Sequence, residues 1–268
     1  MTRKPSRTLP RIVFIGAGNV ATHLAPALEG AGVGEVVQVY SRTEASACAL
    51  AARLWDAEAV TDTSLIIPDA DIYLVSLADH ATRDVLARLS PNNALWLHTS
   101  GSLPIDVLRP MSRKCGVFYP LQTFSKGVTP DIDRIPLFIE GSTPGVEAEI
   151  REMGEKVFKR IVHADSALRR RMHVAAVFAC NFTNYLWGVA DDLLRAEGLD
   201  LSVLHPLLDE TLRKAETLPG GPAAGQTGPA VRGDMKVMAA HEESLTPELA
   251  AIYRQLSEAI YNRYHPEK

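Results

Sequence analysis

Cysteine is scarce in this chain of 268 residues, and the three that are present, Cys48, Cys115 and Cys180, are odd in number and widely spaced. Such a set provides neither a disulfide framework nor the paired spacing of a zinc site. Long hydrophobic runs are absent as well, because no stretch reaches the roughly 18 consecutive apolar residues of a membrane span. We therefore expect no metal ion and no membrane contact, and a reduced, cytoplasmic setting.

Positive charge is not in excess either. Lysine and arginine number 28 against 32 aspartate and glutamate residues, which gives a formal net charge of −4. General nucleic-acid binders carry a basic excess, so this composition argues against a nucleic-acid partner. The basic segment MTRKPSRTLP at residues 1–10 is not followed by the long apolar stretch of a signal peptide, and we expect it to be a flexible N-terminus.

From residue 11 to about 164 the chain alternates strand-like and helical segments. The strand-like segments are short, rich in Val, Ile and Leu, and bounded by turn or polar residues. They lie at 11–15, 35–41, 71–77, 94–99, 115–120, 135–140 and 160–164, and the helical segments lie at 19–31, 43–54, 79–90 and 145–158. This alternation predicts right-handed crossovers and a parallel sheet with helices on both faces.

The pattern becomes purely helical after residue 165. Asp165 or Ser166 can cap a helix whose apolar pattern continues to about residue 195. Further helical segments lie at 201–218, 229–244 and 247–263, and a Gly- and Pro-rich loop at 219–229 interrupts them. We therefore predict two domains, an α/β domain at 11–165 and an all-α domain at 166–268.

The first strand-like segment leads into the sequence GAGNVA, which places Gly16 and Gly18 before a helix and Ala21 in its first turn. Gly16 permits a tight turn, Gly18 lets a pyrophosphate approach the backbone, and a small residue at 21 lets the helix pack closely on the strand. Asn19 and Val20 lie at the positive helix N-terminus, where phosphates bind. We predict a dinucleotide site; the alternative is a glycine turn with a purely structural role.

The end of the second strand indicates which dinucleotide is bound. Sites that prefer NAD usually place Asp or Glu there to hold the ribose hydroxyls, whereas this chain offers Ser41, Arg42 and Thr43. An arginine can pair with the 2′-phosphate of NADP, and the hydroxyls add further donors. We therefore predict NADP, used as NADPH; the alternative is that Arg42 is an ordinary solvated residue.

Two further turns follow the strand-like segments at 71–77 and 94–99. Ligands of open α/β sheets bind outside the carboxyl ends of the strands. Residues of these turns are therefore expected to line the nicotinamide side of the site: Ser76, Leu77, Ala78, Thr99, Ser100 and Gly101. Taken singly, each has an equally good interpretation as a capping or turn residue.

The helix predicted after residue 165 carries polar residues in the apolar stretch HVAAVFACNFTNYL, 173–186. At about 100° per residue, Asn181 lies about 80° and Asn184 about 20° around the helix from His173, so the three share one face. Such groups cost about 1–3 kcal/mol each if they are buried without partners. We predict that they point into a catalytic cleft; hydrogen bonds to neighbouring helices are the alternative.

These segments together resemble a known group of proteins. The glycine loop, SRT at 41–43, HTSG at 98–101, FYPLQTF at 118–124, the stretch at 173–186 and TGPAVRGD at 227–234 are similar to NADP oxidoreductases that join a Rossmann-like domain to a C-terminal domain of unknown function. The resemblance covers about residues 10–265, and more distantly extends to pyrroline-5-carboxylate reductase, ketopantoate reductase and the β-hydroxyacid dehydrogenases. It implies a Rossmann-like fold, NADP, a helical domain like the C-terminal domain of 6-phosphogluconate dehydrogenase, and a homodimer through the helices.

The resemblance also suggests a role for the polar helix face. β-Hydroxyacid dehydrogenases carry Lys-x-x-x-Asn on the corresponding helix, facing the nicotinamide. Matching Asn181 to that asparagine puts Val177 in the place of the lysine, and a valine cannot transfer a proton. His173 lies one turn earlier, and histidine suits acid–base chemistry at neutral pH. We predict that His173 replaces the lysine; the alternative is a structural histidine at the domain junction.

Two other features bear on the substrate. Arg169, Arg170 and Arg171 lie in the first turn of the helix, where cations oppose the helix dipole. We expect one or more of them to hold an anionic group, either a cofactor phosphate or a substrate carboxylate, and a solvated charged face is the alternative. Tyr119 stands in the segment where prephenate dehydrogenases place a His-Pro pair, which disfavours that activity. Tyr119 and Gln122 are expected to border the cleft or to pack at a strand end.

The sequence thus favours an NADP-dependent oxidoreductase that acts on a small, anionic carbonyl, imine or hydroxy compound. The cofactor would supply the hydride, and the protein the orientation and a proton route. One alternative is a non-catalytic NADP-binding sensor or regulatory protein, which the missing lysine favours. Another is a helical assembly module with a structural glycine loop. We expect two chains to form a homodimer through the helical domain.

Overall fold

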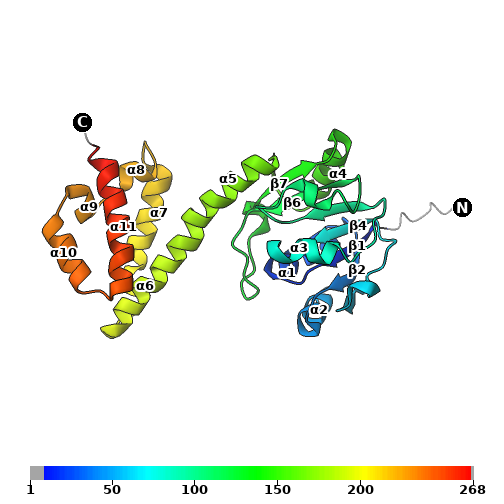
Figure 1. Cartoon of the computed structure of the whole chain (residues 1–268), viewed down its shortest axis with the longest axis horizontal. Helices are drawn as coiled ribbons and strands as arrows, with labels where there is room; N and C mark the ends of the chain where they lie inside the picture. Colours follow the sequence, from blue (N-terminus) through cyan, green and yellow to red (C-terminus); the bar gives the residue numbers. More distant parts are fainter. Residues whose placement is uncertain (1–8, 267–268) are drawn as a thin grey trace, which may run out of the picture. The chain divides into compact units, whose positions relative to one another are not determined.

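The computed structural model describes residues 9–266 of the chain. Residues 1–8, most of the predicted flexible N-terminus, lie outside this range. The chain forms two compact units, one that ends at Asn184 and one that begins at Tyr185 (Figure 1). The predicted boundary at residue 165 lies directly after the last strand. The units divide later, after Asn184, because the first part of the helix that follows the strand packs with the first unit.

The first unit is built on one sheet of eight strands, which confirms the predicted α/β class (Figure 1). The strand order is β3-β2-β1-β4-β5-β6-β7-β8. The strands are β1 Arg11–Ile15, β2 Glu35–Tyr40, β3 Glu58–Val60, β4 Ile72–Val75, β5 Leu95–His98, β6 Cys115–Pro120, β7 Pro136–Gly141 and β8 Arg160–His163. The sequence pattern does not predict β3, because that strand has three residues and begins with a glutamate.

The prediction of a parallel sheet is wrong at one edge. The strands from β1 to β6 pair in parallel, but β7 pairs with β6 in the antiparallel sense, and β8 is parallel to β7. A parallel crossover needs about a dozen residues or more and usually contains an α-helix. The connection at 121–135 contains only the short 3₁₀ helix η3, Ile132–Arg134, so the chain returns beside β6 in the opposite direction.

Helices cover both faces of the sheet and create two apolar cores. One core lies under α1 (Asn19–Gly30), α2 (Glu44–Ala51) and α4 (Pro144–Glu155). The other lies under α3 (Asp79–Leu86) and the 3₁₀ helix η2 (Ile105–Leu108). Side chains alternate between the two faces of a strand: in β4, Leu74 packs in the first core and Tyr73 in the second. Both faces are therefore buried, as the Val-, Ile- and Leu-rich strands predict.

The helix after the sheet has the predicted length but is not regular. α5 (Ser166–Ala176) begins after the cap residue Asp165, as predicted. The next segment, Val177–Phe182, is a π-helix, and α6 (Thr183–Ala196) follows it. The apolar stretch at 173–186 is largely exposed within this chain, since Phe178 and Phe182 expose 65% and 51% of their surface.

The second unit is all helical, as predicted (yellow to red in Figure 1). After α6 it contains η5 (Leu201–Leu204), α7 (His205–Thr217), α8 (Pro222–Gly225), α9 (Pro229–Arg232), α10 (Met235–Glu243) and α11 (Pro247–Tyr264). The helix predicted at 229–244 is divided because Gly233 takes a left-handed φ of +67°, after which Asp234 caps α10. Across residues 9–266, no helix is both long enough and apolar enough to cross a membrane.

Candidate active site

The glycine turn after β1 is closely constrained on one side and open on the other. Gly16 has a φ of +117°, and a Cβ built on it would lie 2.2 Å from the carbonyl oxygen of Ser76, so only glycine fits. Its N–H donates to the carbonyl of Tyr40. Gly18 is the N-cap of α1, and a Cβ there would meet no heavy atom closer than 4.0 Å. The turn therefore presents backbone that a phosphate can approach.

The N-terminus of α1 follows this turn directly. Asn19 and Val20 are its first residues, and its first turn carries no acidic side chain to compete with a phosphate. Ala21 is fully buried against the sheet, so the helix packs closely, as predicted from its small size. The free N–H groups and the dipole of a helix of this length favour an anion at this end.

The turn after β2 lies on the neighbouring strand. The N–H of Ser41 donates to the carbonyl of Val60, while Arg42 and Thr43 are exposed before the start of α2. Because β1 and β2 are adjacent and parallel, their carboxyl ends lie at the same edge of the sheet. The basic side chain predicted to read the 2′-phosphate is therefore placed beside the glycine turn.

The turns after β4 and β5 are linked to each other. The hydroxyl of Thr99 donates to the hydroxyl of Ser76 at 3.2 Å. Ser100 folds its own turn back, because its hydroxyl accepts hydrogen bonds from the N–H groups of Ser102 and Leu103. Leu77 and the α3 N-cap Ala78 complete the first of the two turns. The structure thus brings the predicted cofactor residues to one carboxyl edge, at the ends of β1, β2, β4 and β5.

His98, the last residue of β5, is a buried support for this edge. Its side chain is 1% exposed, its Nδ1 accepts a hydrogen bond from the N–H of Ser100, and its Nε2 has no partner within residues 9–266. Burial, with a smaller effect of the nearby Arg169 charge, lowers the pKa of His98 to about 3. The ring is therefore neutral at physiological pH and serves to hold the Ser100 turn.

Arg169 is used inside the protein and does not bind an external anion. Its side chain is fully buried and pairs with the carboxylate of Glu140 at 2.6 Å. The same guanidinium donates to the backbone carbonyls of Ser100, Leu103 and Ala164. The predicted anion-binding role is therefore wrong for this arginine, and its burial was hidden because its partners come from distant segments. Arg170 and Arg171 are exposed.

Three segments meet at Gly101. The hydroxyl of Tyr119, at the end of β6, lies 3.2 Å from Nδ1 of His173 on α5. A Cβ on Gly101 would lie 2.7 Å from that nitrogen and 2.8 Å from the Tyr119 oxygen. Burial raises the pKa of the Tyr119 hydroxyl above its ordinary value. His173 thus reaches the carboxyl edge, and Tyr119, which the sequence placed only at a border, is its direct partner.

This pair forms the polar end of a cavity of about 510 Å³ within the first unit. The remaining wall comes from the loop after β6 and from one side of α5 and the π-helix. The lining residues are Tyr119, Leu121, Gln122, Thr123, Met172, His173, Ala175, Ala176, Val177, Ala179, Cys180 and Asn181. They include no lysine, arginine, aspartate or glutamate. The cavity therefore suits an apolar molecule with one hydrogen-bonding group.

The π-helix determines which asparagine faces this cavity. A π turn holds about one residue more than an α turn, because its hydrogen bonds join residues five apart. Residues beyond the π-helix therefore lag by about one position, which moves Asn184 to roughly 80° from His173. Both asparagines are exposed, and of the two only Asn181 lines the cavity. Asn184 was predicted to point into the cleft with His173 and Asn181, and it does not line this cavity.

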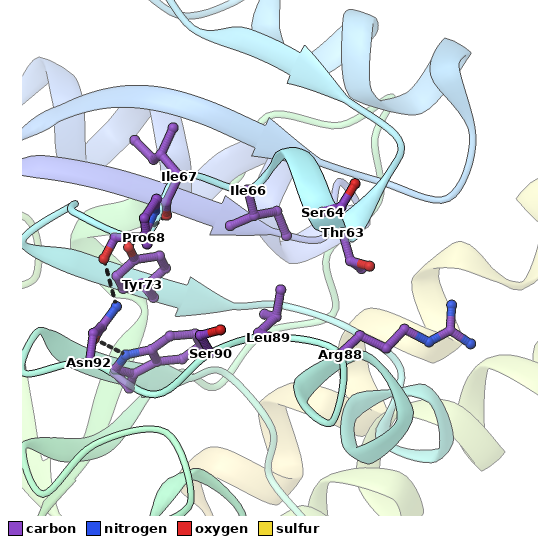
Figure 2. Close-up of a pocket in the computed structure, with 11 residues that line it drawn as sticks. Thr63, Ser64, Ile66, Ile67, Pro68, Tyr73, Arg88, Leu89, Ser90 and Asn92 are labelled. Carbon is purple, nitrogen blue, oxygen red and sulfur yellow. Dashed lines mark hydrogen bonds between the residues drawn. The ribbon is translucent and has the colours of Figure 1, made fainter.

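A second cavity, of about 230 Å³, lies away from this edge (Figure 2). Its lining includes Ile67 and Asn92, which precede β4 and β5, and Tyr73, the second residue of β4, so it opens near the amino ends of the strands. Its polar groups are largely occupied: Asn92 donates to the carbonyl of Pro68 (Figure 2). The side-chain oxygen of Asn92 also accepts a hydrogen bond from Nε1 of Trp96. This geometry offers no approach to the glycine turn.

Comparison with known protein families agrees with the geometry. Residues 11–99 match a family model described as NADP oxidoreductase, coenzyme F420-dependent. Residues 135–260 match a domain of unknown function, DUF2520. No curated protein matches the chain significantly. The two matched segments correspond to the part of the sheet that carries the glycine turn and to the part that carries α5 and the helices after it.

Solved structures extend the comparison. A Bacteroides fragilis protein assigned as an NADP oxidoreductase is 42% identical, with a TM-score of 0.89, and the match covers 95% of this chain and 98% of that one. A reductive aminase from Aspergillus terreus, solved with NADPH and ethyl-5-oxohexanoate, is 16% identical (TM-score 0.64, 96% and 95% covered). An imine reductase from Streptomyces aurantiacus is 18% identical (TM-score 0.62, 94% and 93% covered). The last two share the fold.

Proposed function

Because this chain belongs to the family of NADP oxidoreductases that carry a C-terminal domain of unknown function, we propose that it uses NADPH to reduce a small, uncharged carbonyl or imine compound with an apolar body. One observation carries the proposal. The apolar cavity has its polar end, Tyr119 and His173, packed against Gly101 at the carboxyl edge where the cofactor turns converge. The reverse reaction would oxidise the matching hydroxy compound or amine.

The residues at this edge fit the cofactor. The pyrophosphate would bind over Gly16 and Gly18 at the N-terminus of α1, where a Cβ at residue 16 would collide with Ser76. Arg42, with the hydroxyls of Ser41 and Thr43, would hold the 2′-phosphate. The residues proposed for the nicotinamide side are Ser76, Leu77, Ala78, Thr99, Ser100 and Gly101. Asn19, Val20 and Ala21, at the start of α1, belong to the pyrophosphate side.

The chemistry divides between the cofactor and the chain. NADPH, when bound, supplies the hydride. The chain's own residues would orient the substrate and supply the proton: Tyr119 and His173 hold exchangeable protons at the polar end, and Asn181 offers an amide on the same wall. Leu121 and Val177 contribute apolar surface to the wall, against which the body of the substrate would pack.

The proposed substrate is uncharged, in contrast to the anionic compound expected from the arginine cluster. Arg169 is committed to Glu140, and no cationic side chain lines the cavity. An ionised carboxylate bound there would give up part of its hydration without gaining a cationic partner, which disfavours its binding. A ketone, aldehyde or imine needs only one hydrogen-bond donor, and Tyr119 and His173 provide it.

The test is a turnover screen with the full chain and NADPH. Neutral ketones, aldehydes and cyclic imines would each be paired with a 2-oxo acid of similar carbon skeleton, and NADPH consumption would be followed. We expect at least one neutral compound to be reduced, with a kcat/KM about tenfold or more above that of its paired acid. A consistent preference for the acids contradicts the proposed substrate class. Tight NADPH binding without turnover of any compound supports a sensor instead.

We also propose that two chains associate through the helical unit and that the protein works in the cytoplasm. The first proposal is supported by large apolar side chains that the unit leaves exposed, including Leu207 at 64% and Leu212 at 61%, both on α7. Large apolar side chains left exposed in such number are typical of a surface that another chain covers. The second is supported by three widely spaced free cysteines.

A further inference from the structure

We infer that Tyr119 donates the proton to the reduced oxygen or nitrogen atom, and that His173 positions Tyr119 and restores its proton. This inference rests on the proposed function and names the proton donor of the same site. It reverses the order expected from the sequence, where His173 alone was the donor.

The geometry favours Tyr119 because its hydroxyl is held from one side only. Tyr119 comes from the end of β6, next to β5, whose following turn carries Gly101. Nδ1 of His173 lies 3.2 Å from the hydroxyl oxygen, and the phenol ring packs edge-on to the imidazole at 65°. When Nδ1 carries the hydrogen, it donates to the phenol oxygen, and the phenol O–H is then free to point into the cavity.

The protonation of the phenol agrees with this role. Burial is the main reason that the pKa of Tyr119 is raised. A tyrosine therefore keeps its proton throughout the physiological range, and a donor at this position is always loaded. His173 is only partly buried, and its Nε2 has no hydrogen-bond partner within residues 9–266. Water can therefore reach the ring on the side away from Tyr119.

The proton transfer balances without a further reagent. Two electrons reach the substrate with the hydride of NADPH, which leaves as NADP⁺. The O–H bond of Tyr119 breaks as the O–H or N–H bond of the product forms. The phenolate then takes the Nδ1 proton of His173, and His173 takes a proton from water at Nε2. The ring ends neutral as the Nε2–H tautomer, and proton exchange with water returns it to the Nδ1–H tautomer before the next turnover, so the net proton comes from solvent.

The experiment compares Tyr119→Phe with a matched control in the full chain. Tyr253→Phe removes a hydroxyl from a second Tyr–His pair, in which Tyr253 lies 2.8 Å from Nδ1 of His241 in the helical unit. With NADPH and the neutral compound found by the screen, we expect Tyr119→Phe to lower kcat about 10²–10⁴-fold, with an unchanged Kd for NADPH. Tyr253→Phe should retain the wild-type kcat.

Two further readouts separate donation from simple packing. The kcat of the wild type should fall only above about pH 10, because the tyrosine must keep its proton to donate it. This decrease at alkaline pH should be absent in Tyr119→Phe. His173→Gln keeps a hydrogen-bond donor but cannot pass a proton on, so kcat should fall while KM changes little. The inference is overturned if Tyr119→Phe keeps more than about half of the wild-type kcat, or if only the His173 variant loses activity.

A binding measurement decides the inference even if no compound is turned over. Cyclohexanone would be titrated into the protein saturated with NADP⁺, where no reduction can occur, and followed by NMR. We expect Tyr119→Phe to weaken cyclohexanone binding about tenfold, because a hydrogen bond to the carbonyl is lost. Equal affinities, or no binding by the wild-type protein, would overturn the role of Tyr119. Absence of turnover alone would count against the proposed function.

Discussion

Arg169 on α5 and Glu140 on β7 form an ion pair of 2.6 Å in which the arginine side chain is completely closed to solvent. Removing one member leaves the other charged and largely buried, which typically costs about 3–5 kcal/mol. We therefore predict that Arg169→Met lowers the free energy of unfolding by this amount in urea titrations. Adding Glu140→Gln should recover part of the loss, because it removes the stranded charge.

The matched control for this prediction is Arg213→Met. Arg213 pairs with Glu210 at 2.7 Å on the surface of α7, where solvent screens the interaction. Exposed pairs contribute about 0–1 kcal/mol. Equal losses in the Arg169 and Arg213 variants would contradict the structural role of the buried pair.

The buried His98 predicts a pH-dependent stability. Its pKa is about 3 in the folded protein against 6.5 for an ordinary histidine, so between these values the unfolded chain binds a proton that the folded one does not. Stability is therefore complete above about pH 6.5 and falls as the pH decreases towards 3, by up to roughly 1.4 kcal/mol per pH unit. Urea unfolding at a series of pH values should show a shallower slope for His98→Asn than for the wild type. The exposed His80 provides the control, because His80→Asn should leave the slope unchanged.

Cofactor preference should depend on Arg42. If this exposed side chain holds the 2′-phosphate, Arg42→Ala should weaken NADPH binding about tenfold to a hundredfold and leave NADH binding nearly unchanged. Calorimetry of both cofactors tests this directly. Arg53→Ala removes an exposed arginine beyond the other end of α2 and should change neither affinity. Equal affinities of the wild type for NADPH and NADH would refute the assignment.

Gly101 should tolerate no side chain. The Cβ of Gly101→Ala would lie 2.7 Å from Nδ1 of His173, so the imidazole or the Tyr119 ring must move. A displacement of about 1 Å at a reacting group can cost 10²-fold in rate. We expect kcat to fall by about that factor while the fold persists by circular dichroism. Gly127→Ala, in the loop after β6, has open space around its Cβ and should behave as the wild type.

The proposed homodimer can be measured by light scattering. At micromolar concentration we expect a particle of about twice the chain mass of 29.2 kDa. Leu207→Glu places a charge on the exposed apolar surface of α7 and should shift the mass towards one chain. Leu65→Glu alters a similarly exposed leucine in the α/β unit and should not. A wild-type particle with the mass of a single chain would refute the proposal.

Local patterns predicted the parts of the site that depend on neighbouring residues. The run from Arg11 through the glycine turn to α1 could be predicted because strand, turn and helix each have their own short-range signal. The helical nature of the chain after residue 165 was equally accessible, because apolar periodicity and the cap Asp165 lie within it. The placement of Ser76 and Thr99 at one edge then followed from the rule for parallel strands.

The remaining features depend on contacts between distant segments. Nothing in VFACNF distinguishes a π-helix from an α-helix, so the position of Asn184 could not be foreseen. Arg169 looked like a surface residue because its partners, Glu140 and the carbonyls of the 100–103 turn, come from other strands. The pairing of Tyr119 with His173 joins residues 54 positions apart, and no local signal links them.

The reversed edge of the sheet determines where α5 begins. β8 ends with His163 beside Ile139, which lies opposite Phe118, one residue beyond the Val117 that pairs with His98 at the end of β5. The chain therefore leaves the sheet level with the carboxyl edge. Ser166 therefore starts α5 beside Glu140, and successive turns carry the helix towards Gly101. Two strands that contribute no proposed site residue thus decide that the histidine and the tyrosine can meet.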